Sequence, residues 1–185
     1  SPQNIPIQIL TIQQDANGII WLGTGGSGLF KLNPDSGAIE HIEYQPGYST
    51  ILPSNLVWAL YPDKNNILWV ATNRGLVKMN TLNQTSTTYL PSITTRGSIS
   101  DYRALCLLRD SRGILWVGTA SGLNRYDDKT NSFYAYRVDD GLPNDFIYYM
   151  FENFIFIRVS QENAFLAEHK TVSGIHYLEL IYILS

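Results

Sequence analysis

Few residues of this 185-residue chain have the types and spacing that metal binding or catalysis requires. Its histidines are His41, His169 and His176, and on the regular part of the chain none stands at metal-ligand spacing from the single cysteine, Cys106. His169 and His176 lie in a segment of different character, where we do not expect a shared metal site. Cys106 lies in an apolar stretch without a disulfide partner, so we expect a buried hydrophobic residue. We therefore expect neither a metal nor a cofactor.

Three other short motifs have simpler structural explanations. The glycine-rich stretch at 23–28 joins two expected strands and opens no helix, which argues against a phosphate-binding loop. The sequence Asp-Ala-Asn-Gly at 15–18 lacks the further acidic ligands of a calcium loop. The adjacent carboxylates of Asp139 and Asp140 lie in a connecting segment and are expected to be solvated. No nucleophile-elbow or Walker sequence occurs.

The strongest pattern is a motif that occurs three times: an aspartate, a tryptophan six residues later, and then a Gly-Leu pair. The three copies contain Asp15 and Trp21, Asp63 and Trp69, and Asp110 and Trp116. The tryptophans are 48 and 47 residues apart, and a period of this length indicates a repeat architecture. The repeated residues are therefore expected to build the fold.

Each copy predicts the same four strands. An apolar segment precedes the aspartate, which opens a four-residue hairpin turn that ends in Gly or Asn, and a short apolar strand then carries the tryptophan. A third strand follows the Gly-Leu pair, and a fourth, more polar strand lies at the edge. The first strands are expected at 7–14, 56–61 and 102–108, third strands at 29–33 and 123–126, and the fourth at 39–44, 86–90 and 133–136.

A four-stranded sheet whose second strand is apolar on both faces must stack on copies of itself, and radial stacking gives a β-propeller. The sequence therefore predicts an all-β fold, a β-propeller fragment of about three to four four-stranded antiparallel blades within residues 1–150. Blades are expected at 5–44, 56–90 and 102–136, with the next beginning at 144. Each repeat tryptophan is expected between neighbouring blades, where truncation to alanine costs roughly 3–5 kcal/mol.

The pattern fails after residue 150. With Asn144 taken as the equivalent of Asn55, the offsets of the second copy place Glu152 at the aspartate position but Arg158 at the tryptophan position. Residues 151–185 are therefore expected to be either a divergent blade or a non-native tail that follows a truncation or an altered reading frame. Two segments of this tail are strand-prone, 154–159 and 175–184.

The motif Asp-x-x-Gly/Asn-x-Leu/Ile-Trp-x-Gly/Ala-Thr, followed by Gly-Leu, resembles the two-component regulator propeller repeat, as does the connector Gly-Leu-Pro-Asn-Asp-Phe-Ile at 141–147. The resemblance covers residues 5–150. It implies seven-bladed propellers, often two in tandem, that form the extracytoplasmic sensor of hybrid two-component proteins in gut Bacteroides-type bacteria. In such a parent a β-sandwich, a transmembrane helix, a histidine kinase and often a DNA-binding response regulator follow, and many such sensors respond to polysaccharide breakdown products.

Other propeller families fit the motif less well. WD-type repeats have Trp-Asp at a strand end, whereas leucine or valine follows the tryptophan here. The Asp-box of sialidase-like glycosidases places its glycine and its aromatic residue one position closer to the aspartate. A carbohydrate-active propeller enzyme would also need paired carboxylates on the innermost strands, which supply almost none. A ligand sensor, such an enzyme and a protein-interaction scaffold remain three alternatives, of which the sensor is preferred.

The candidate ligand-binding residues lie on one edge of the expected blades, where the second-to-third turns and the blade connectors meet. Loops on a rigid scaffold commonly carry function, and aromatic, arginine and asparagine side chains suit a polar ligand such as an oligosaccharide. Trp58, on an innermost strand, either lines the channel or packs. The candidates are Tyr48, Asn73, Arg74, Arg96, Tyr102 and Arg103, with Asn144 on the same edge.

Composition narrows the class of partner. The chain is 44% hydrophobic with a formal net charge of −3 and no basic stripe, which argues against nucleic acid. No apolar run reaches the ~18 residues that span a bilayer, so we expect no membrane contact by this chain. The resemblance implies a periplasmic location, a small-molecule or oligosaccharide ligand, a homodimeric parent, and no catalysis within the chain.

Overall fold

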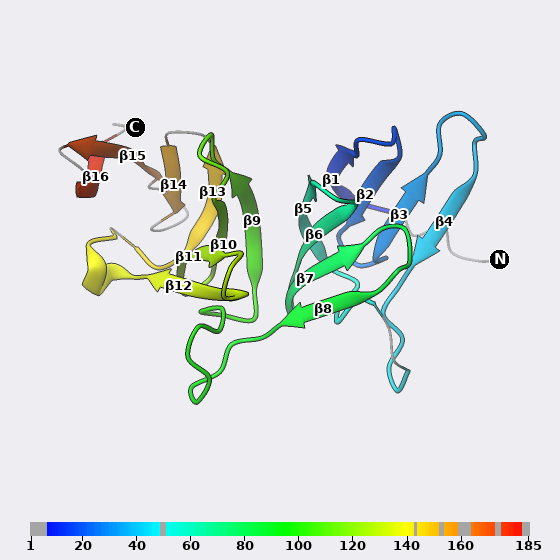
Figure 1. Cartoon of the computed structure of the whole chain (residues 1–185), viewed down its shortest axis with the longest axis horizontal. Coiled ribbons are helices and arrows are strands. Elements are labelled where there is room, and N and C mark those ends of the chain that lie inside the picture. Colours follow the sequence, from blue (N-terminus) through cyan, green and yellow to red (C-terminus); the bar gives the residue numbers. More distant parts are fainter. Residues whose placement is uncertain are drawn as a thin grey trace. The chain divides into compact units, whose positions relative to one another are not determined.

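The structure is a computed structural model that describes residues 7–48, 51–142 and 144–151, and the backbone of three further strands between residues 154 and 182. The strands form four antiparallel sheets of four strands each (Figure 1). Every sheet is built from strands that are consecutive in sequence, paired in sequence order. The prediction of an all-β propeller fragment made of four-stranded antiparallel blades is therefore confirmed.

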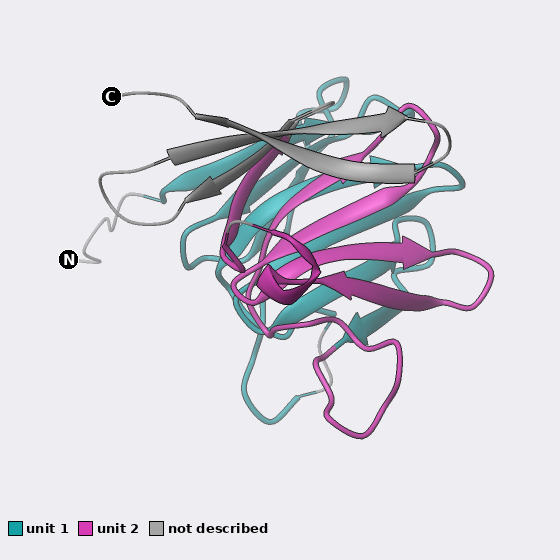
Figure 2. Cartoon of the chain, turned by 90° about the vertical axis from the view of Figure 1, so that its left-hand side faces the viewer, with its two compact units in different colours: residues 1–89 teal, residues 90–185 magenta. Residues whose placement is uncertain are grey.

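The chain divides into two compact units, residues 1–89 and 90–185 (Figure 2). The first unit holds the first and second sheets, and the second unit holds the third and fourth sheets. The first sheet comprises β1 (Ile9–Gln14), β2 (Ile20–Thr24), β3 (Leu29–Leu32) and β4 (Ile39–Ile42). The second comprises β5 (Val57–Asp63), β6 (Ile67–Thr72), β7 (Gly75–Asn80) and β8 (Ser86–Tyr89). The third comprises β9 (Ala104–Arg109), β10 (Leu115–Thr119), β11 (Gly122–Asp127) and β12 (Ser132–Tyr136). The fourth comprises β13 (Ile147–Phe151), β14 (Phe154–Arg158), β15 (Ala164–Val172) and β16 (Ile175–Tyr182).

The repeated aspartate links the first hairpin to the tryptophan in every copy. In the third sheet, Asp110 Oδ1 accepts the backbone N–H groups of Arg112 at 3.1 Å and Ile114 at 2.9 Å, which holds the turn closed. Its Oδ2 accepts the indole N–H of Trp116 at 3.0 Å. Asp15 binds Trp21 in the same way at 2.9 Å. One carboxylate therefore closes the turn and fixes the indole ring.

The second copy keeps the indole bond but makes a different turn from the other two copies. Asp63 Oδ2 accepts the Trp69 N–H at 3.0 Å, while its Oδ1 accepts the adjacent Lys64 N–H at 2.8 Å. Asp63 still pairs with Ile67 in the sheet. The loop then turns through two left-handed residues, Asn65 and Asn66, because no glycine is present and asparagine tolerates that conformation.

Two repeat tryptophans lie in the core between successive sheets. Trp21 is buried in one cluster with Val57 and Leu60 of β5. In the second unit, Trp116 is partly buried against Ile147 and Met150 of β13. Each indole face therefore receives the first strand of the sheet that follows it in sequence. The third tryptophan, Trp69, is fully buried, with the Tyr89 ring 5.8 Å and the Lys78 Nζ 5.2 Å from its own ring.

In the first and third copies, glycine two residues after the tryptophan allows the next sheet to approach closely, and the second copy has Ala71 at this position. A Cβ atom added at Gly23 would lie 2.6 Å from Val57 Cγ1. At Gly118 an added Cβ would meet Cys106 Sγ and would lie 2.7 Å from Ile147 Cγ2 and 2.9 Å from the Ile147 carbonyl oxygen. The Gly/Ala position of the motif thus sets how near the next sheet can come.

The prediction that the second strand is buried on both faces holds for the second sheet but not for the first. Strand β6 is buried at every residue from Leu68 to Thr72. In β2, by contrast, Ile20 and Leu22 remain half-buried. Both belong to the face opposite Trp21, and no other described sheet of the first unit covers that face.

In the tail, β14 and β16 fall on the two strand-prone segments, while β15 was not expected. The backbone of β13 to β16 pairs as a four-stranded antiparallel sheet. The side chains of residues 151–185 lie outside the described part, and so do His169, His176, Glu152 and Arg158 as candidate site or repeat residues. That this tail departs from the repeat sequence stays a prediction.

We expect Asp110→Ala to lower the free energy of unfolding by about 1–3 kcal/mol, because the Trp116 N–H and two turn N–H groups lose their acceptor in a partly buried site. Asp127→Ala is the matched control, since Asp127 accepts hydrogen bonds from Lys129 and Thr130 within an exposed turn. Urea denaturation measures both variants. Equal losses would show that the indole bond adds nothing to the turn cap.

Asp110 also makes stability depend on pH. Burial alone would raise the pKa of its carboxyl, but N–H donation from Trp116, Ile114 and Arg112, together with the Arg112 charge, outweighs burial and lowers that pKa. A carboxyl with a lowered folded pKa stabilises the fold above its unfolded pKa of about 4, and that stabilisation disappears as pH falls through the folded value. We expect the urea midpoint to drop below about pH 4, and to drop less steeply in Asp110→Asn. If the urea midpoint of Asp110→Asn fell with pH as steeply as that of the wild type, Asp110 would not be the group that makes stability depend on pH.

Gly118→Ala should cost about 1–3 kcal/mol by overpacking, because its Cβ meets the β9 and β13 atoms that define the contact between the third and fourth sheets. Thr87→Ala on the exposed strand β8 is a control expected within about 0.5 kcal/mol of wild type. Thermal unfolding compares the two. An unchanged melting temperature in Gly118→Ala would show that β13 does not pack closely on β10.

Candidate functional site

The candidate site lies along one edge of the sheets. Turns in a sequential antiparallel sheet alternate between two edges, so the aspartate turns lie on one, which we call the hairpin edge. The β2–β3, β6–β7 and β10–β11 turns lie on the other, together with the segments at 43–56, 90–103 and 137–146 that lead into the next sheet. We call this second edge the connector edge.

A buried threonine fixes the second-to-third turn in every copy. The Thr24 hydroxyl donates to the Gly28 carbonyl oxygen at 2.8 Å. In the same way, the Thr72 hydroxyl donates to the Gly75 carbonyl at 2.7 Å. The Thr119 hydroxyl donates to the Gly122 carbonyl at 2.8 Å. Each hydroxyl also accepts a backbone N–H from within the turn. These three side chains are at most 1% exposed. The buried threonine thus holds the turn backbone from the interior, while the outward side chains of the turn can vary.

The connector of the first unit is tied to this turn. The Gly28 N–H donates to the Asn55 carbonyl oxygen at 2.8 Å. The Asn55 side chain accepts the Tyr44 N–H at 2.6 Å and donates to the Tyr44 carbonyl at 3.2 Å. Asn55 therefore joins the start of the connector, its end and the adjacent turn.

In the second unit, Asp145 makes the corresponding bonds. The Gly122 N–H donates to the Asp145 carbonyl oxygen at 2.7 Å, and Asp145 Oδ1 accepts the Val138 N–H at 2.8 Å. Asn144 instead accepts the Phe146 N–H at 2.7 Å. The equivalent of Asn55 is therefore Asp145, which corrects by one residue the sequence register counted from Asn144. That register was misread because both residues follow a Leu-Pro pair with nearby asparagine.

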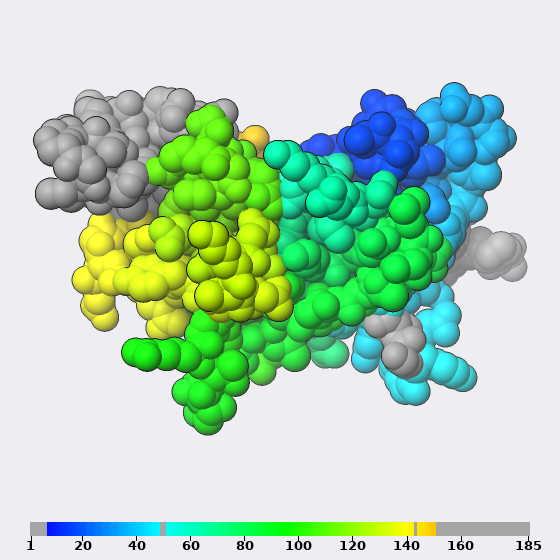
Figure 3. Space-filling model, in the orientation of Figure 1, coloured from blue at the N-terminus to red at the C-terminus, as the bar shows by residue number. Residues whose placement is uncertain are grey.

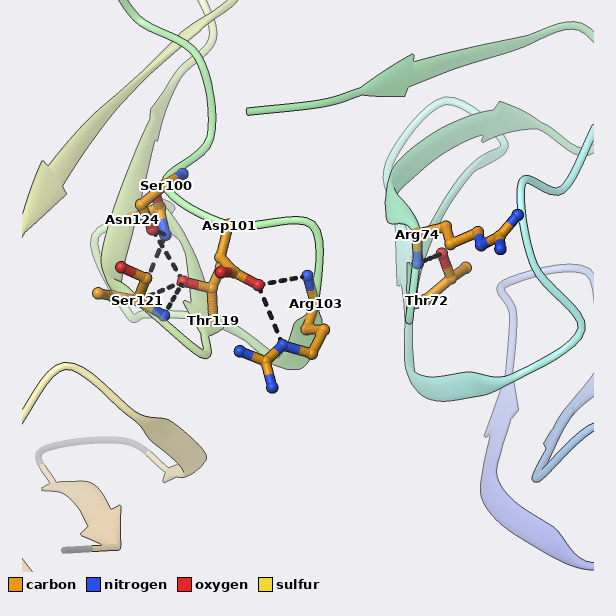
Figure 4. Close-up of polar contacts among 9 residues, drawn as sticks. Thr72, Arg74, Ser100, Asp101, Arg103, Thr119, Ser121 and Asn124 are labelled. Atoms are coloured by element: carbon orange, nitrogen blue, oxygen red, sulfur yellow. Dashed lines mark hydrogen bonds and ion pairs between the residues drawn. The ribbon is translucent and has the colours of Figure 1, made fainter. Parts of the chain in front are cut away.

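A buried polar group anchors the connector at 90–103 (Figure 4). Asn124 is fully buried in β11, and its Oδ1 accepts the Ser100 N–H at 2.9 Å. Its Nδ2 donates to Ser100 Oγ at 2.8 Å and to the Val117 carbonyl at 3.2 Å, and Ser100 Oγ lies 2.8 Å from Thr119 Oγ1. Sequence reading missed Asn124, because nothing in the repeat marks an asparagine where the second copy has valine.

Within this connector, residues 92–98 form a loop closed at its base. The Ser98 hydroxyl donates to the Ser92 carbonyl at 3.0 Å, and the Ser92 N–H donates to Ser98 Oγ at 3.1 Å. The Gly97 carbonyl accepts the Phe133 N–H of β12 at 2.8 Å. The loop projects from the body of the second unit in Figure 3, where it is green. Arg96 is exposed on this loop.

Of the six predicted ligand-binding residues, Tyr48, Asn73 and Arg74 belong to the first unit and lie at its connector edge. The Tyr48 side chain is 73% exposed. The Arg74 backbone N–H donates to Thr72 Oγ1 at 3.1 Å, and its guanidinium extends away from that turn (Figure 4). Asn73 is half-buried and donates its backbone N–H to Leu56 O at 3.2 Å. Their backbones are thus fixed by the scaffold.

The other three, Arg96, Tyr102 and Arg103, belong to the second unit. Asp101 Oδ1 accepts the Arg103 backbone N–H at 2.8 Å and lies 3.3 Å from Arg103 Nε. The Arg103 side chain is 51% exposed, and Figure 4 shows its Nη groups directed away from Asp101. Tyr102 is 55% exposed. A guanidinium held through Nε keeps its Nη groups available to bind the oxygen atoms of a polar ligand.

Trp58 differs from the other three tryptophans. It is partly buried on β5, and no acceptor among the described residues lies within hydrogen-bonding distance of its Nε1. It occupies a β-bulge, because the pairing of β5 with β6 shifts between Val57 and Ala59. The first strand of each other sheet shifts at the same place, leaving Leu10, Leu105 and Tyr148 as the extra residues.

The other residues considered for chemistry, His41, Asp140 and Cys106, lie in environments that a structural role explains. His41 stacks on Phe30 with ring centroids 4.2 Å apart. Asp140 accepts the Arg137 N–H at 2.9 Å at the start of the 3₁₀ turn Val138–Asp140. Burial raises the pKa of the Cys106 thiol to about 12, so it stays protonated at neutral pH. In the described part of the chain, no cluster of three His, Cys, Asp or Glu side chains could hold a metal ion.

The described residues include no helix with the length and apolar character needed to cross a membrane.

Solved structures are similar to this chain in fold. The chain matches the extracellular domain of a protein described as a hybrid two component system from B. thetaiotaomicron, with a TM-score of 0.74 and 22% identity over 87% of this chain and 23% of that one. It also matches virginiamycin B lyase from Staphylococcus aureus, with a TM-score of 0.64 and 16% identity over 99% of this chain and 57% of that one. The chain thus spans about a quarter of the first structure. At these identities the matches establish the propeller fold alone.

Sequence comparison identifies the repeat itself. No curated protein sequence matches the chain at a significant level. The family model described as the two component regulator propeller matches residues 3–26, 51–74 and 98–121. Each match contains the aspartate, the tryptophan and the buried threonine of one sheet. The chain therefore carries three repeats of the two-component regulator propeller family.

Proposed function

We propose that this chain is a ligand-sensing propeller segment of an extracytoplasmic two-component sensor, that it binds an oligosaccharide at its connector edge, and that it performs no catalysis. The proposal places the segment in the periplasm, within a homodimeric inner-membrane protein that carries a histidine kinase. The family match supports the regulatory setting. The ligand class, the location and the parent's modules are parts of the proposal.

The observation that carries the ligand site is the held guanidinium of Arg103. Asp101 binds its Nε at 3.3 Å and leaves the Nη groups facing away from Asp101, and the preceding residue, Tyr102, is exposed. Sugars offer hydroxyl oxygen atoms to a planar donor and a ring face to an aromatic side chain. Because Asp101 orients the guanidinium before binding, less side-chain entropy is lost on complex formation.

The distribution of repeated and variable residues supports binding at the same edge. The aspartate, tryptophan, threonine and glycine positions are occupied by the scaffold's own hydrogen bonds and contacts. The outward residues of the connector edge, such as Arg74 and Arg103, differ from copy to copy. Variable side chains on fixed turns are a common arrangement for recognition.

A carbohydrate-active enzyme is the first alternative, and the described inner strands argue against it. Strands β1, β5 and β9 contain one acidic residue, Asp63, which binds the Trp69 indole. Glycoside hydrolysis requires a pair of carboxyl groups. The match to virginiamycin B lyase concerns the fold and brings no catalytic residue to this chain. A protein-interaction scaffold is the second alternative, and a binding experiment separates it from a sensor.

We expect the chain to bind selected oligosaccharides on a glycan array, and Arg103→Ala and Tyr102→Ala each to weaken that binding tenfold or more. Loss of charged hydrogen bonds costs about 1.5–3 kcal/mol, which accounts for this range. Lys129→Ala, an exposed cation at the hairpin edge of the same unit, is the matched control and should bind as wild type does.

Turnover of the bound sugar would favour the enzyme. No binding to any oligosaccharide on the array, together with specific capture of a protein, would favour the scaffold. Equal binding by Arg103→Ala and wild type would move the ligand site away from this part of the connector edge. Asp101→Asn refines the test. Because Asp101 only positions the guanidinium, its substitution should weaken affinity less than Arg103→Ala, which removes the guanidinium itself.

A further inference from the structure

A cation lies across the strand pair from the repeat tryptophan in every copy. The pairs in chain order are Trp21 with Lys31, Trp69 with Lys78, and Trp116 with Arg125. Directly paired residues project to the same side of a sheet, with Cβ atoms about 5 Å apart. The tryptophan-bearing face of each of these three sheets therefore carries a positive charge next to the indole ring.

In the first two sheets this cation is held by the sheet itself. Lys31 Nζ lies 5.8 Å from the centre of the Trp21 ring and donates to Glu40 Oε2 at 3.1 Å. Lys78 Nζ lies 5.2 Å from the centre of the Trp69 ring. Both lysines are half-buried. An indole ring therefore stabilises each charge, and a carboxylate adds to this for Lys31.

The third sheet leaves its cation exposed. Arg125 is paired with Tyr134 on β12, in the place that Glu40 takes beside Lys31. The Arg125 side chain is exposed, and within the described part of the chain no hydrogen bond or ion pair holds its guanidinium. The exchange of an acid for a tyrosine therefore leaves this positive charge available to another molecule.

Three aromatic rings adjoin this guanidinium. Trp116 and Tyr134 are the residues paired with Arg125 on its two sides. The Tyr136 ring lies 5.9 Å from the Trp116 ring and 4.7 Å from the Tyr134 ring, which it meets edge-on at 65°. Tyr134 is 54% exposed, and its strand β12 is the last of its sheet (Figure 1). An exposed ring braced by a second ring thus stands directly beside an exposed charge.

We propose that Arg125, Tyr134, Tyr136 and Trp116 form a further binding site, the Arg125 site, for a small ligand that carries a carboxylate on a ring. The guanidinium donates two parallel N–H bonds to the carboxylate oxygen atoms. The ring of the ligand packs on Tyr134. The acidic ring of a sugar and the ring of an aromatic acid share this chemistry.

The charges around Arg125 favour a carboxylate over a phosphate. One guanidinium supplies a single positive charge, and Asp127 lies two residues along the same strand. Asp127 feels the Arg125 charge through space, but its carboxylate accepts hydrogen bonds from Lys129 and Thr130 in the turn. A dianion would be repelled by this neighbouring carboxylate, whereas the single charge of a carboxylate matches that of one guanidinium.

The Arg125 site is separate from the connector edge. Arg125 and Tyr134 lie within β11 and β12, between the turns at either end of these strands. The inference therefore depends neither on a ligand at Arg103 nor on the sensor role.

The test is a titration of the ¹⁵N-labelled chain, followed by NMR, with four probes. D-glucuronate and benzoate each carry a carboxylate on a ring, D-glucose has the ring without the carboxylate, and acetate has the carboxylate without the ring. We expect glucuronate, benzoate or both to shift the amide signals of Arg125, Tyr134 and Ala135, and to bind at least tenfold more tightly than glucose and acetate.

The probes also distinguish the two sources of the ligand. Binding of glucuronate alone assigns the site to an acidic sugar, and binding of benzoate alone assigns it to an aromatic acid. Acetate binding as tightly as the ring acids would overturn the inference, because the ring would then add nothing. Absence of shifts at these three amides would overturn it as well.

Variants test the two parts of the site. We expect Arg125→Ala to weaken binding of the ring acid at least tenfold, and Tyr134→Ala at least threefold. Tyr134→Glu should also abolish binding, because it gives the third sheet the acid that holds Lys31 in the first. Lys129→Ala is the matched control, since it removes an exposed cation from the adjoining turn and should bind as wild type does.

Equal weakening by Lys129→Ala and Arg125→Ala would reduce the effect to general charge attraction and would overturn the inference. Unchanged amide signals in β9 and β10 verify that each variant is folded. Should Arg125→Ala fail this check, Arg125→Gln removes the charge and keeps most of the side chain. Wild-type affinity in Arg125→Gln would contradict the site.

Discussion

The structure depends on a carboxylate that serves two partners at once. In every repeat one oxygen of the aspartate accepts the indole N–H six residues later, and in the first and third repeats the other oxygen closes the first hairpin. A tryptophan buried in an apolar layer needs an acceptor for its N–H, and the turn supplies one without placing a polar group in the core. The same bond therefore orients the ring on which the next sheet packs. Hairpin, core and sheet-to-sheet contact therefore share a single side chain.

The opposite edge is organised by a second set of short-range bonds. A buried threonine holds each second-to-third turn, and Asn55 or Asp145 ties the connector to that turn. Because these bonds involve backbone groups and internal side chains, they leave the outward side chains of the connector edge unconstrained. A rigid backbone with free side chains is what a recognition surface requires, and Arg103 beside Asp101 uses it directly.

Sequence alone predicted the strands of the first three sheets, their order and the all-β propeller class, because the spacing of Asp110 and Trp116 recurs in register and each copy carries turn residues with a known geometry. It could not reveal that Asp110 reaches Trp116, since this contact depends on the pairing of β9 with β10. Threonine hydroxyl bonds were missed because threonine is also an ordinary strand residue. The Asn65–Asn66 turn differs from the other two aspartate turns because both asparagines adopt the left-handed conformation. The six ligand-binding residues remain predictions, although their positions on the connector edge follow from strand alternation.

The bulge at the same place in the first strand of all four sheets has a further consequence. An extra residue opposite a single partner escapes the ladder, so its side chain is not matched to a neighbour across the sheet. The four extra residues are accordingly diverse: Leu10, Trp58, Leu105 and Tyr148. Every repeat thus contains one position where evolution can exchange an aliphatic group for an aromatic ring while the hydrogen-bond pattern around it stays intact. The inner strands can diversify in chemistry without any change of backbone.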